Sequence, residues 1–387
     1  MNGWHGRLLK VDLSLGRAWE EALPEGILQN YLGGRGLGVR LMRDYFHLDP
    51  FIAEIPIIFS VGPLCGTPAP TAARLGVVSR SPLTGTIYDC SAGGRFAWRL
   101  KAAGYDALKI VGQSNQPVVL QIGPQGAELL PAKKLWGLTV GETVSALSAY
   151  GSVAAIGPAG ENRVLYANIM MGEGNSVGRG GLGAVMGAKR LKAIVVDGDT
   201  KTELADKERF DHARKDVIRL FKASPVIYGD LGIAQYGTPA LVDLMAQRRM
   251  APTENFRKTY FEAAGQYSGP AIRKEYQPKN HGCYGCPIQC KKSTQDGIPL
   301  PEYETVNHFG ALNNIKDLRT IVNSNNLCNQ LGMDTISAAA TLSAWGEARG
   351  EFPRAEDIGE LLRKIAHRQG DGDLLAEGAQ RVALRQG

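Results

Sequence analysis

His281-Gly-Cys283-Tyr-Gly-Cys286-Pro-Ile-Gln-Cys290-Lys-Lys292 is the stretch around which the rest of the chain is organised. It places three thiols within eight positions, on a loop that its glycines and Pro287 keep from forming a regular helix. Thiolates this close together repel one another and are costly to desolvate unless a cation lies among them or they oxidise. An iron–sulfur cluster and a zinc ion both meet that condition and usually take four ligands, with His281 as a candidate fourth ligand for zinc. Unligated thiols are the third interpretation.

The composition is that of an ordinary globular chain with an excess of glycine. Of 387 residues, 44% are apolar and 21% charged, while the 48 glycines make up about 12%, against about 7% on average. The net charge of +6 is mild, and the absence of an arginine-rich run argues against nucleic acid as a partner. We expect no membrane span and no secretory leader, because neither apolar pattern is present. Six cysteines in a chain this long do not suggest a disulfide scaffold, so we expect a reducing, cytoplasmic compartment.

The hydrophobic periodicity changes along the chain and predicts an α+β protein. Up to about residue 200, short apolar runs between turns predict strands at residues 7–13, 55–61, 108–112, 118–122 and 193–196. Beyond about residue 204, amphipathic periods predict helices at residues 207–223, 239–249, 317–331, 355–369 and 374–384. We therefore expect a β-rich domain at 1–200 and a mainly helical domain at 201–387, with the boundary near Asp197-Gly-Asp-Thr200.

Four stretches that combine glycine with arginine lie in the first half of the chain. They are residues 31–38, 62–85, 91–95 and 178–187. Glycines let backbone N–H groups converge on an anion, and a neighbouring arginine supplies a bidentate fork for a phosphate. Each stretch alone also fits a structural turn, and none carries a nucleotide-binding fingerprint in its proper context. Together with the thiol loop, they suit a large, polyanionic redox cofactor that binds to the β-rich domain.

The order and the sequences of these motifs resemble those of the aldehyde ferredoxin oxidoreductase family from one end of the chain to the other. The matching stretches are residues 4–13, 31–38, 62–70, 81–85, 103–107, 155–160, 178–187, 301–305 and 331–337. The resemblance implies a tungsten, rarely molybdenum, bis-pyranopterin cofactor beside a four-iron four-sulfur (4Fe-4S) cluster. It also implies that the N-terminal β-rich domain is the base for the cofactor and that two largely helical domains cover it. Nothing in the sequence distinguishes tungsten from molybdenum.

The resemblance assigns roles to residues around the cluster and the first pterin. Arg74 matches an arginine between cluster and pterin, where its guanidinium donates to both. Ser91 and Gly93 match a loop that approaches the pterin, where a backbone carbonyl helps to hold Mg²⁺ between the phosphates. The first three cluster ligands correspond to Cys283, Cys286 and Cys290.

Further roles follow for the second pterin and the metal. Arg179 and Gly180 match the loop on the other pterin. Glu304 matches a carboxylate near tungsten that transfers a proton or positions water, although taken alone it also fits a salt bridge or a helix cap. The family's Asp-x-x-Gly-Leu-Asp pattern stands here as Asn329-Gln-Leu-Gly-Met-Asp334, so Asn329 keeps a hydrogen bond to a pterin amine without the charge.

The implied reaction is oxidation of a small aldehyde to a carboxylic acid, with electrons leaving through the cluster to ferredoxin or an iron–sulfur subunit. The fourth cluster cysteine and later family motifs are not found before Gly387. We therefore expect that a third, C-terminal helical domain is missing from this chain. An incompetent fragment, one half of a split enzyme with a separate C-terminal-domain polypeptide, and a zinc-stabilised binding module remain alternatives.

The remaining cysteines and histidines have simpler interpretations. Cys328 lies in a helical pattern beside Leu327 and is expected to be a buried core thiol. Cys65 and Cys90 are expected to be small packing residues beside the glycine loops.

Overall fold

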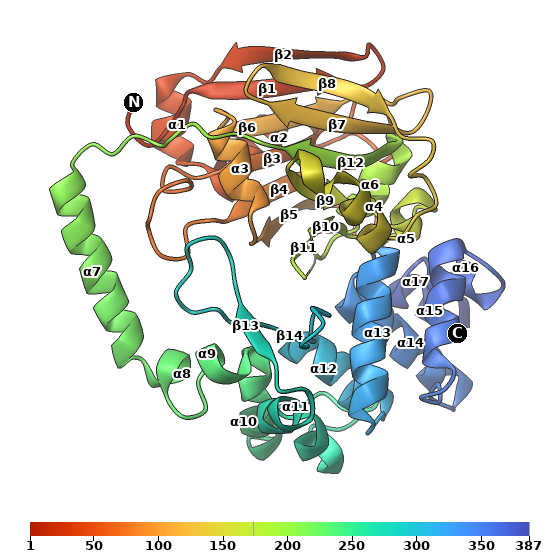
Figure 1. The fold of residues 1–387 in the computed structure, drawn as a ribbon. Coiled ribbons are helices and arrows are strands. Elements are labelled where there is room, and N and C mark those ends of the chain that lie inside the picture. Colours follow the sequence, from red (N-terminus) through yellow and green to blue (C-terminus); the bar gives the residue numbers. More distant parts are fainter. Residues whose placement is uncertain (173, 387) are drawn as a thin grey trace. The chain divides into compact units, whose positions relative to one another are not determined.

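The computed structural model describes residues 1–172 and 174–386, and strands dominate the first half of that range (Figure 1). The described residues fall into two units. The base unit comprises Met1–Val217 together with Cys283–Pro287, and the helical unit comprises Ile218–Gly282 and Ile288–Gly387. A β-rich N-terminal half followed by a mainly helical half is the α+β fold class that the sequence predicts, and this prediction is confirmed.

The first sheet of the base unit has six strands in the order β2-β1-β6-β3-β4-β5. Its central strand β3 is buried at every position, as its unbroken apolar run Ile-Ile-Phe-Ser-Val predicts. β1 pairs in parallel with β6, and the other neighbours are antiparallel. The strands are β1 (Arg7–Asp12), β2 (Arg17–Ala22), β3 (Ile57–Val61), β4 (Leu75–Arg80), β5 (Ile87–Ala92) and β6 (Ala107–Val111).

The second sheet of the base unit also has six strands, in the order β11-β10-β9-β12-β7-β8. β12 is fully buried and pairs in parallel with β7, whereas the other pairs are antiparallel. The strands are β7 (Val118–Gly123), β8 (Gly126–Pro131), β9 (Ser152–Ala155), β10 (Ile169–Met171), β11 (Ser176–Val177) and β12 (Leu191–Val196).

One apolar core joins the two sheets of the base unit. It includes Phe59 from the first sheet and Leu120 and Ile194 from the second, all fully buried. Phe96 on helix α3 (Phe96–Ala102) joins the same core, with its ring centroid 6.1 Å from that of Phe59. Each such side chain contributes about 1.5–3 kcal/mol of burial free energy, so this core fixes both sheets and α3 as one rigid support.

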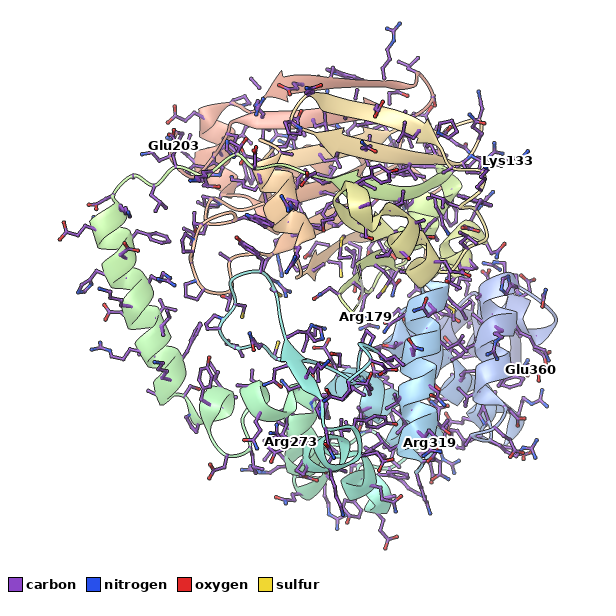
Figure 2. All side chains as sticks on the ribbon, viewed as in Figure 1. Lys133, Arg179, Glu203, Arg273, Arg319 and Glu360 are labelled. Atoms are coloured by element: carbon purple, nitrogen blue, oxygen red, sulfur yellow. The ribbon has the colours of Figure 1, made fainter. Side chains whose placement is uncertain are left out.

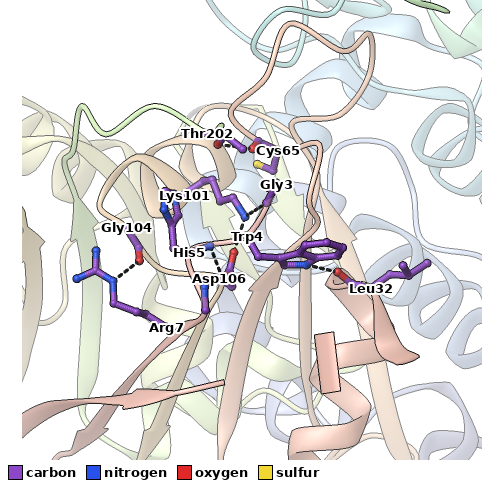
Figure 3. A network of polar contacts seen from close by, with 11 residues as sticks. Gly3, Trp4, His5, Arg7, Leu32, Cys65, Lys101, Gly104, Asp106 and Thr202 are labelled. Atoms are coloured by element: carbon purple, nitrogen blue, oxygen red, sulfur yellow. Dashed lines mark hydrogen bonds and ion pairs between the residues drawn. The ribbon is translucent and has the colours of Figure 1, made fainter. Parts of the chain in front are cut away.

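A buried ion pair ties the N-terminus to the base unit (Figure 3). The side chains of Lys101 and Asp106 are both inaccessible to solvent and form a salt bridge. Asp106 Oδ2 accepts hydrogen bonds from the backbone N–H groups of His5 at 2.9 Å and Gly6 at 2.7 Å. Lys101 Nζ also donates to the carbonyl oxygen of Gly3 at 2.7 Å. Because the pair is buried, these extra hydrogen bonds offset the desolvation of both charges.

The other helices of the first half cover or link the strands. They are α1 (Glu25–Tyr31), α2 (Gly34–Met42), α4 (Val140–Leu147), α5 (Pro158–Glu161), α6 (Leu182–Ala188) and α7 (Lys207–Ala223).

Helices α12, α13, α14 and α15 form the core of the helical unit. α14 packs against α12 and α17, and α13 packs against α15, with Ile321, Leu342 and Leu362 fully buried. The elements of the unit are α8 (Pro225–Tyr228), α9 (Ile233–Tyr236), α10 (Leu241–Gln247), α11 (Gly269–Tyr276), β13 (Lys279–His281), β14 (Lys291–Ser293), α12 (Tyr303–Phe309), α13 (Leu318–Leu331), α14 (Thr335–Arg349), α15 (Ile358–His367), α16 (Asp371–Leu375) and α17 (Ala379–Gln386). Within the part of the chain that the structure describes, no helix combines the length and apolarity that a membrane crossing requires.

Most predicted elements are present, and one helix prediction is wrong. The prediction of a single helix at residues 374–384 fails because Gly378 has φ +91°, which separates α16 from α17. The helix predicted at 239–249 begins as a 3₁₀ turn at Thr238–Ala240 and continues as α10. The helix predicted at 207–223 is α7, with the same bounds.

Candidate cofactor and metal site

Arg74 stands directly before β4 and reaches the end of β5. The two strands are antiparallel, with Leu75 opposite Ala92 and Gly76 opposite Ser91. This register brings Arg74 beside Ser91, although the two residues are 17 positions apart. The guanidinium Nη2 donates to the carbonyl oxygen of Ser91 at 3.4 Å, and the side chain is exposed. Its remaining N–H groups are therefore available to an anion.

Three side chains converge on Gly93, which follows β5 and is buried. A Cβ atom at Gly93 would overlap Cys283 Sγ, and would lie 3.3 Å from Asn175 Oδ1 and 3.5 Å from Arg74 Nη1. The next residue, Gly94, has φ +100°, which a residue with a side chain rarely adopts. The structure thus brings Arg74, Gly93 and Cys283 together in the base unit, as the resemblance implies. Asn175 joins them without having been predicted.

The loop that carries Arg179 and Gly180 lies against the same edge strand. Gly180 has φ +83°, and a Cβ atom there would overlap the ring of Tyr88 in β5. β11, which precedes the loop, also contacts β5. Arg179 itself is exposed (Figure 2). The glycine-rich loops at 91–95 and 178–187 therefore both adjoin β5. The shared basic surface of Arg74 and Arg179 stays a prediction.

Cys283 and Cys286 belong to the base unit. The backbone N–H of Cys286 donates to the carbonyl oxygen of Cys283 at 3.0 Å, and Gly285 between them has φ +67°. Both thiols are half-buried and free. Among the described residues, no group of three or more His, Cys, Asp or Glu side chains is arranged to hold a metal ion. The ligand set of three cysteines therefore stays a prediction.

Cys290 belongs to the helical unit, where its neighbours are firmly anchored. Lys292 Nζ donates to the carbonyl oxygens of Gln289 at 2.9 Å and Ala234 at 3.0 Å. Burial lowers the pKa of Lys292 to about 8, and the charge of the Cys290 thiolate partly offsets that effect. Gly237, with φ +69°, lies so close that a Cβ atom would be 2.9 Å from the carbonyl oxygen of Cys290.

Cys328 and Cys65 are not available as ligands. Both side chains are almost fully buried, as predicted. Burial raises the pKa of the Cys65 thiol to about 12 and raises that of Cys328 still further. Cys90 is half-buried against the core of the base unit.

Glu304 lies in the first turn of α12 and is exposed. Its backbone carbonyl oxygen contacts His308 Nδ1 at 2.7 Å. Its carboxylate has no hydrogen bond or ion pair with the described residues. The salt-bridge interpretation therefore finds no partner there, and the role of Glu304 near the metal stays a prediction.

Asn329 and Asp334 lie at the junction of α13 and α14. Asp334 is the N-cap of α14: Oδ1 accepts from the backbone N–H of Ile336 at 3.0 Å, and Oδ2 accepts from Ser337 Oγ at 2.5 Å. Gly332, with φ +77°, ends α13 and donates its N–H to the carbonyl oxygen of Asn329 at 3.3 Å. The Asn-x-x-Gly-Met-Asp pattern therefore ends one helix at its glycine and begins the next at its aspartate. Its role toward a pterin stays a prediction.

Trp98 is the other site residue that the sequence did not single out. Its indole stacks on the ring of Tyr284 with centroids 4.0 Å apart and planes 7° from parallel. No local pattern marks this contact, because the two residues are far apart in the sequence. The third glycine motif ends at Arg95, three positions before Trp98.

The donor chemistry fits the implied cofactors. Cysteines at Cys-x2-Cys-x3-Cys spacing can supply thiolate ligands for soft metals, including iron–sulfur clusters and zinc. The Cys283 thiol over Gly93 and the exposed guanidinium of Arg74 suit a group that combines a soft metal with an anion.

Comparison with known proteins gives consistent matches over the whole chain. The family "Aldehyde ferredoxin oxidoreductase, N-terminal domain" matches residues 8–198, and "Aldehyde ferredoxin oxidoreductase, domains 2 & 3" matches residues 212–387. The tungsten-containing aldehyde ferredoxin oxidoreductase of Pyrococcus abyssi is 40% identical over 416 residues, covering 100% of this chain and 68% of that protein. The protein of the same name from Thermococcus kodakarensis is 39% identical, covering 99% of this chain and 67% of its own length.

A solved structure has the same fold. The active-site complex BamBC of benzoyl coenzyme A reductase, in complex with 1,5-dienoyl-CoA, matches with a TM-score of 0.88 and 28% sequence identity. The match covers 100% of this chain and 64% of that chain. Two family matches that follow one another along the chain, and relatives at about two fifths identity, lead to one conclusion: this chain belongs to the aldehyde ferredoxin oxidoreductase family and is an oxidoreductase.

Proposed function

We propose that this chain forms the cofactor-binding part of a tungsten-dependent aldehyde:ferredoxin oxidoreductase. In the net reaction a small aldehyde and one water give a carboxylic acid, two protons and two electrons. The electrons leave one at a time to ferredoxin or an iron–sulfur subunit. When bound, the tungsten (or molybdenum) bis-pyranopterin and the 4Fe-4S cluster supply this redox chemistry.

The observation that carries the proposal is the convergence of Arg74, Gly93 and Cys283 in the base unit. A guanidinium beside a soft-metal thiol suits a cofactor that combines phosphates with a redox metal, and Gly93 leaves the room that the thiol occupies. Arg74 already donates one N–H to the carbonyl oxygen of Ser91, and this hydrogen bond fixes the guanidinium group. The other N–H groups of the guanidinium remain for the ligand. Conventional nucleotide folds do not combine these features.

Each of the other site residues has a role in binding or proton transfer. Arg179 and the backbone at Gly180 neutralise and approach the phosphates of the second pterin. A backbone carbonyl at Ser91 or Gly93 helps to hold Mg²⁺ between phosphates. Asn329 and Asp334 accept hydrogen bonds from pterin amines. Glu304, whose carboxylate has no partner among the described residues, accepts the proton that the reacting water releases.

Cys283, Cys286 and Cys290 are the proposed ligands of the 4Fe-4S cluster. We also propose a cytoplasmic location, because none of the six cysteines, all of them in the described part of the chain, forms a disulfide. The chain spans about two thirds of the length of its tungsten-containing relatives. The proposed partners include a separate C-terminal-domain polypeptide.

Metal analysis and an activity assay test the proposal together. Protein purified and reconstituted without oxygen is expected to contain tungsten or molybdenum, pterin and about four iron atoms per chain. Aldehyde-dependent reduction of a viologen dye is measured for the chain alone and with a polypeptide that supplies the relatives' uncovered third. Zinc in place of iron, with no pterin, would support the binding-module alternative instead.

A further inference from the structure

The segment Cys283–Pro287 is placed unusually for its position in the sequence. It belongs to the base unit, whereas Gly282 before it and Ile288 after it belong to the helical unit. It forms the tip of the loop between β13 and β14 (Figure 1). Five residues that include Gly285 and Pro287 cannot form a core of their own. Specific contacts with the base unit must therefore hold the segment in place.

Tyr284 makes two of these contacts, one through its side chain and one through its backbone. Its ring stacks on the indole of Trp98, with centroids 4.0 Å apart and an interplanar angle of 7°. Its backbone N–H donates to the carbonyl oxygen of Gly94 at 3.2 Å. An aromatic stack restrains the side chain and the hydrogen bond restrains the backbone, so together they fix the position and direction of the chain at Tyr284. Cys283, whose Sγ lies over Gly93, is the adjacent residue.

Trp98 is itself held firmly. It lies on α3, between residues of the core: Ala97 and Leu100 are fully buried. The guanidinium of Arg99 lies 4.3 Å from the centroid of the indole. Arg99 Nη1 in turn donates to the carbonyl oxygen of Gly198 at 2.7 Å and pairs with Asp197 at 2.9 Å. The indole is thus a rigid platform fixed by the base unit before the cysteine segment reaches it.

An ordinary packing role does not account for this arrangement. Tyr284 remains 41% exposed, so its ring is not part of the fully buried core of the base unit. The stack mainly affects position: it fixes Tyr284, the residue between Cys283 and the turn that leads to Cys286. Whatever the stack contributes to stability, it restrains the backbone directly beside Cys283.

We propose that Trp98 is a positioning residue for the metal site: its stack with Tyr284 holds Cys283 and Cys286 against the Gly93 loop, where they retain a soft-metal group. This inference rests on the proposed function for the identity of the metal group. The placement of the segment by the stack does not depend on that identity, and the two claims can be tested apart.

Hydrogen exchange in the metal-free protein tests the stack alone. Trp98→Leu is expected to speed exchange at the Tyr284 N–H about two- to tenfold, the range that an aromatic pair supports. The measurement uses mass spectrometry of peptides that contain residues 283–287. Trp98→Phe keeps a ring and should restore most of the protection. Trp19→Leu, an exposed tryptophan on β2, is the matched control and should change nothing at this segment.

Iron release to a chelator tests the consequence for the metal group. After anaerobic reconstitution, Trp98→Leu and Tyr284→Leu should each release iron about two- to tenfold faster than the parent protein. The double variant should be no faster than either single variant, because both remove one interaction. Trp98→Phe should return the release rate and the electron paramagnetic resonance signal of the cluster toward those of the parent.

The outcomes separate the two claims. If the parent protein binds no iron while exchange at Tyr284 still responds to Trp98→Leu, the proposed function fails and the positioning of the segment stands. Unchanged exchange in Trp98→Leu would overturn the inference whatever the metal content. Fully additive effects of the two leucine variants on iron release would overturn it as well.

Discussion

The Sγ atom of Cys283 lies in the space that a Cβ atom on Gly93 would need. Residue 93 follows β5 and residue 283 comes from a distant part of the sequence, yet both belong to the base unit. Real Cβ atoms do not approach a sulfur so closely, so any side chain at position 93 must displace the cysteine or the loop. Glycine at this position is therefore a condition for the thiol's location.

Gly93→Ala should consequently weaken metal binding. The added methyl group forces Cys283 away, so iron retained after anaerobic reconstitution and gel filtration should fall by at least half. Gly123→Ala is the matched control, because a Cβ atom there meets nothing within 4 Å and its backbone is not in the left-handed region. An iron content in Gly93→Ala equal to that of the control would show that Cys283 is not a ligand.

Arg74→Ala should release the pterin. The substitution removes a charge-assisted contact worth about 1.5–3 kcal/mol, which corresponds to roughly ten- to 150-fold weaker retention. Arg74→Lys keeps the charge but lacks the planar guanidinium. Its pterin retention should lie between that of the parent and that of Arg74→Ala. Retained pterin is measured by fluorescence after oxidation. Arg17→Ala, which removes an exposed arginine of β2, serves as the control, and equal pterin loss in both variants would contradict the role of Arg74.

Lys189 should make stability depend on pH. Its Nζ is buried and donates to the carbonyl oxygens of Ala53 at 2.8 Å and Gly112 at 3.1 Å. Burial lowers its pKa to about 7, with partial compensation from the charges of Glu54 and Asp12. Between about pH 7 and pH 10 the unfolded chain therefore binds more protons than the folded one, and the free energy of unfolding rises with pH.

The measurement is thermal unfolding at several values of pH between 7 and 10. The difference in midpoint between the parent and Lys189→Met should shift in favour of the parent as the pH rises. Lys133→Met, at an exposed position in Figure 2, should show no such trend. A difference that stays constant over this range would mean that Lys189 keeps an ordinary pKa in the folded protein.

Substitutions at Asp334 should separate its structural role from its proposed role toward the pterin. Asp334→Ala loses the cap of α14 and should cost about 1 kcal/mol, seen as a lower thermal midpoint. Asp334→Asn still caps the helix, so its midpoint should stay close to that of the parent while pterin retention falls. Asp317→Ala removes the equivalent cap of α13. It should lower the thermal midpoint and leave pterin retention unchanged. Full pterin retention in Asp334→Asn would leave the residue with its structural role only.

Local signals in the sequence predicted the fold better than the site. The apolar run of β3 and the amphipathic period of α7 depend on neighbours in the chain, and both elements formed where expected. The division of residues 374–384 into two helices depends on the backbone of Gly378, for which the periodicity carried no signal. The cap by Asp334 was not predicted, although a capping residue directly before a helical period is a recognised start signal.

The site depends on long-range contacts that no local pattern encodes. The resemblance to a family indicated Arg74, Gly93 and the cysteines, and the structure brings Arg74, Gly93 and Cys283 together. It could not indicate Trp98 or Asn175, because each acts on a residue about eighty or more positions away. The assignment of Cys283–Pro287 to the base unit likewise arises only from tertiary contacts.

That assignment makes the base unit discontinuous in the sequence, which has a consequence for how the protein folds. The contact between Trp98 and Tyr284 closes a very long loop, and loop closure of this kind raises contact order and slows folding. Both six-stranded sheets are built from residues synthesised earlier, so the cysteine segment can dock only after the residues of both sheets have been made. A gene truncated after Val217 would encode the sheets but never the thiols that attach to them. With Cys283, Cys286 and Cys290 as the proposed ligands, a complete ligand set would require a chain synthesised past Cys290.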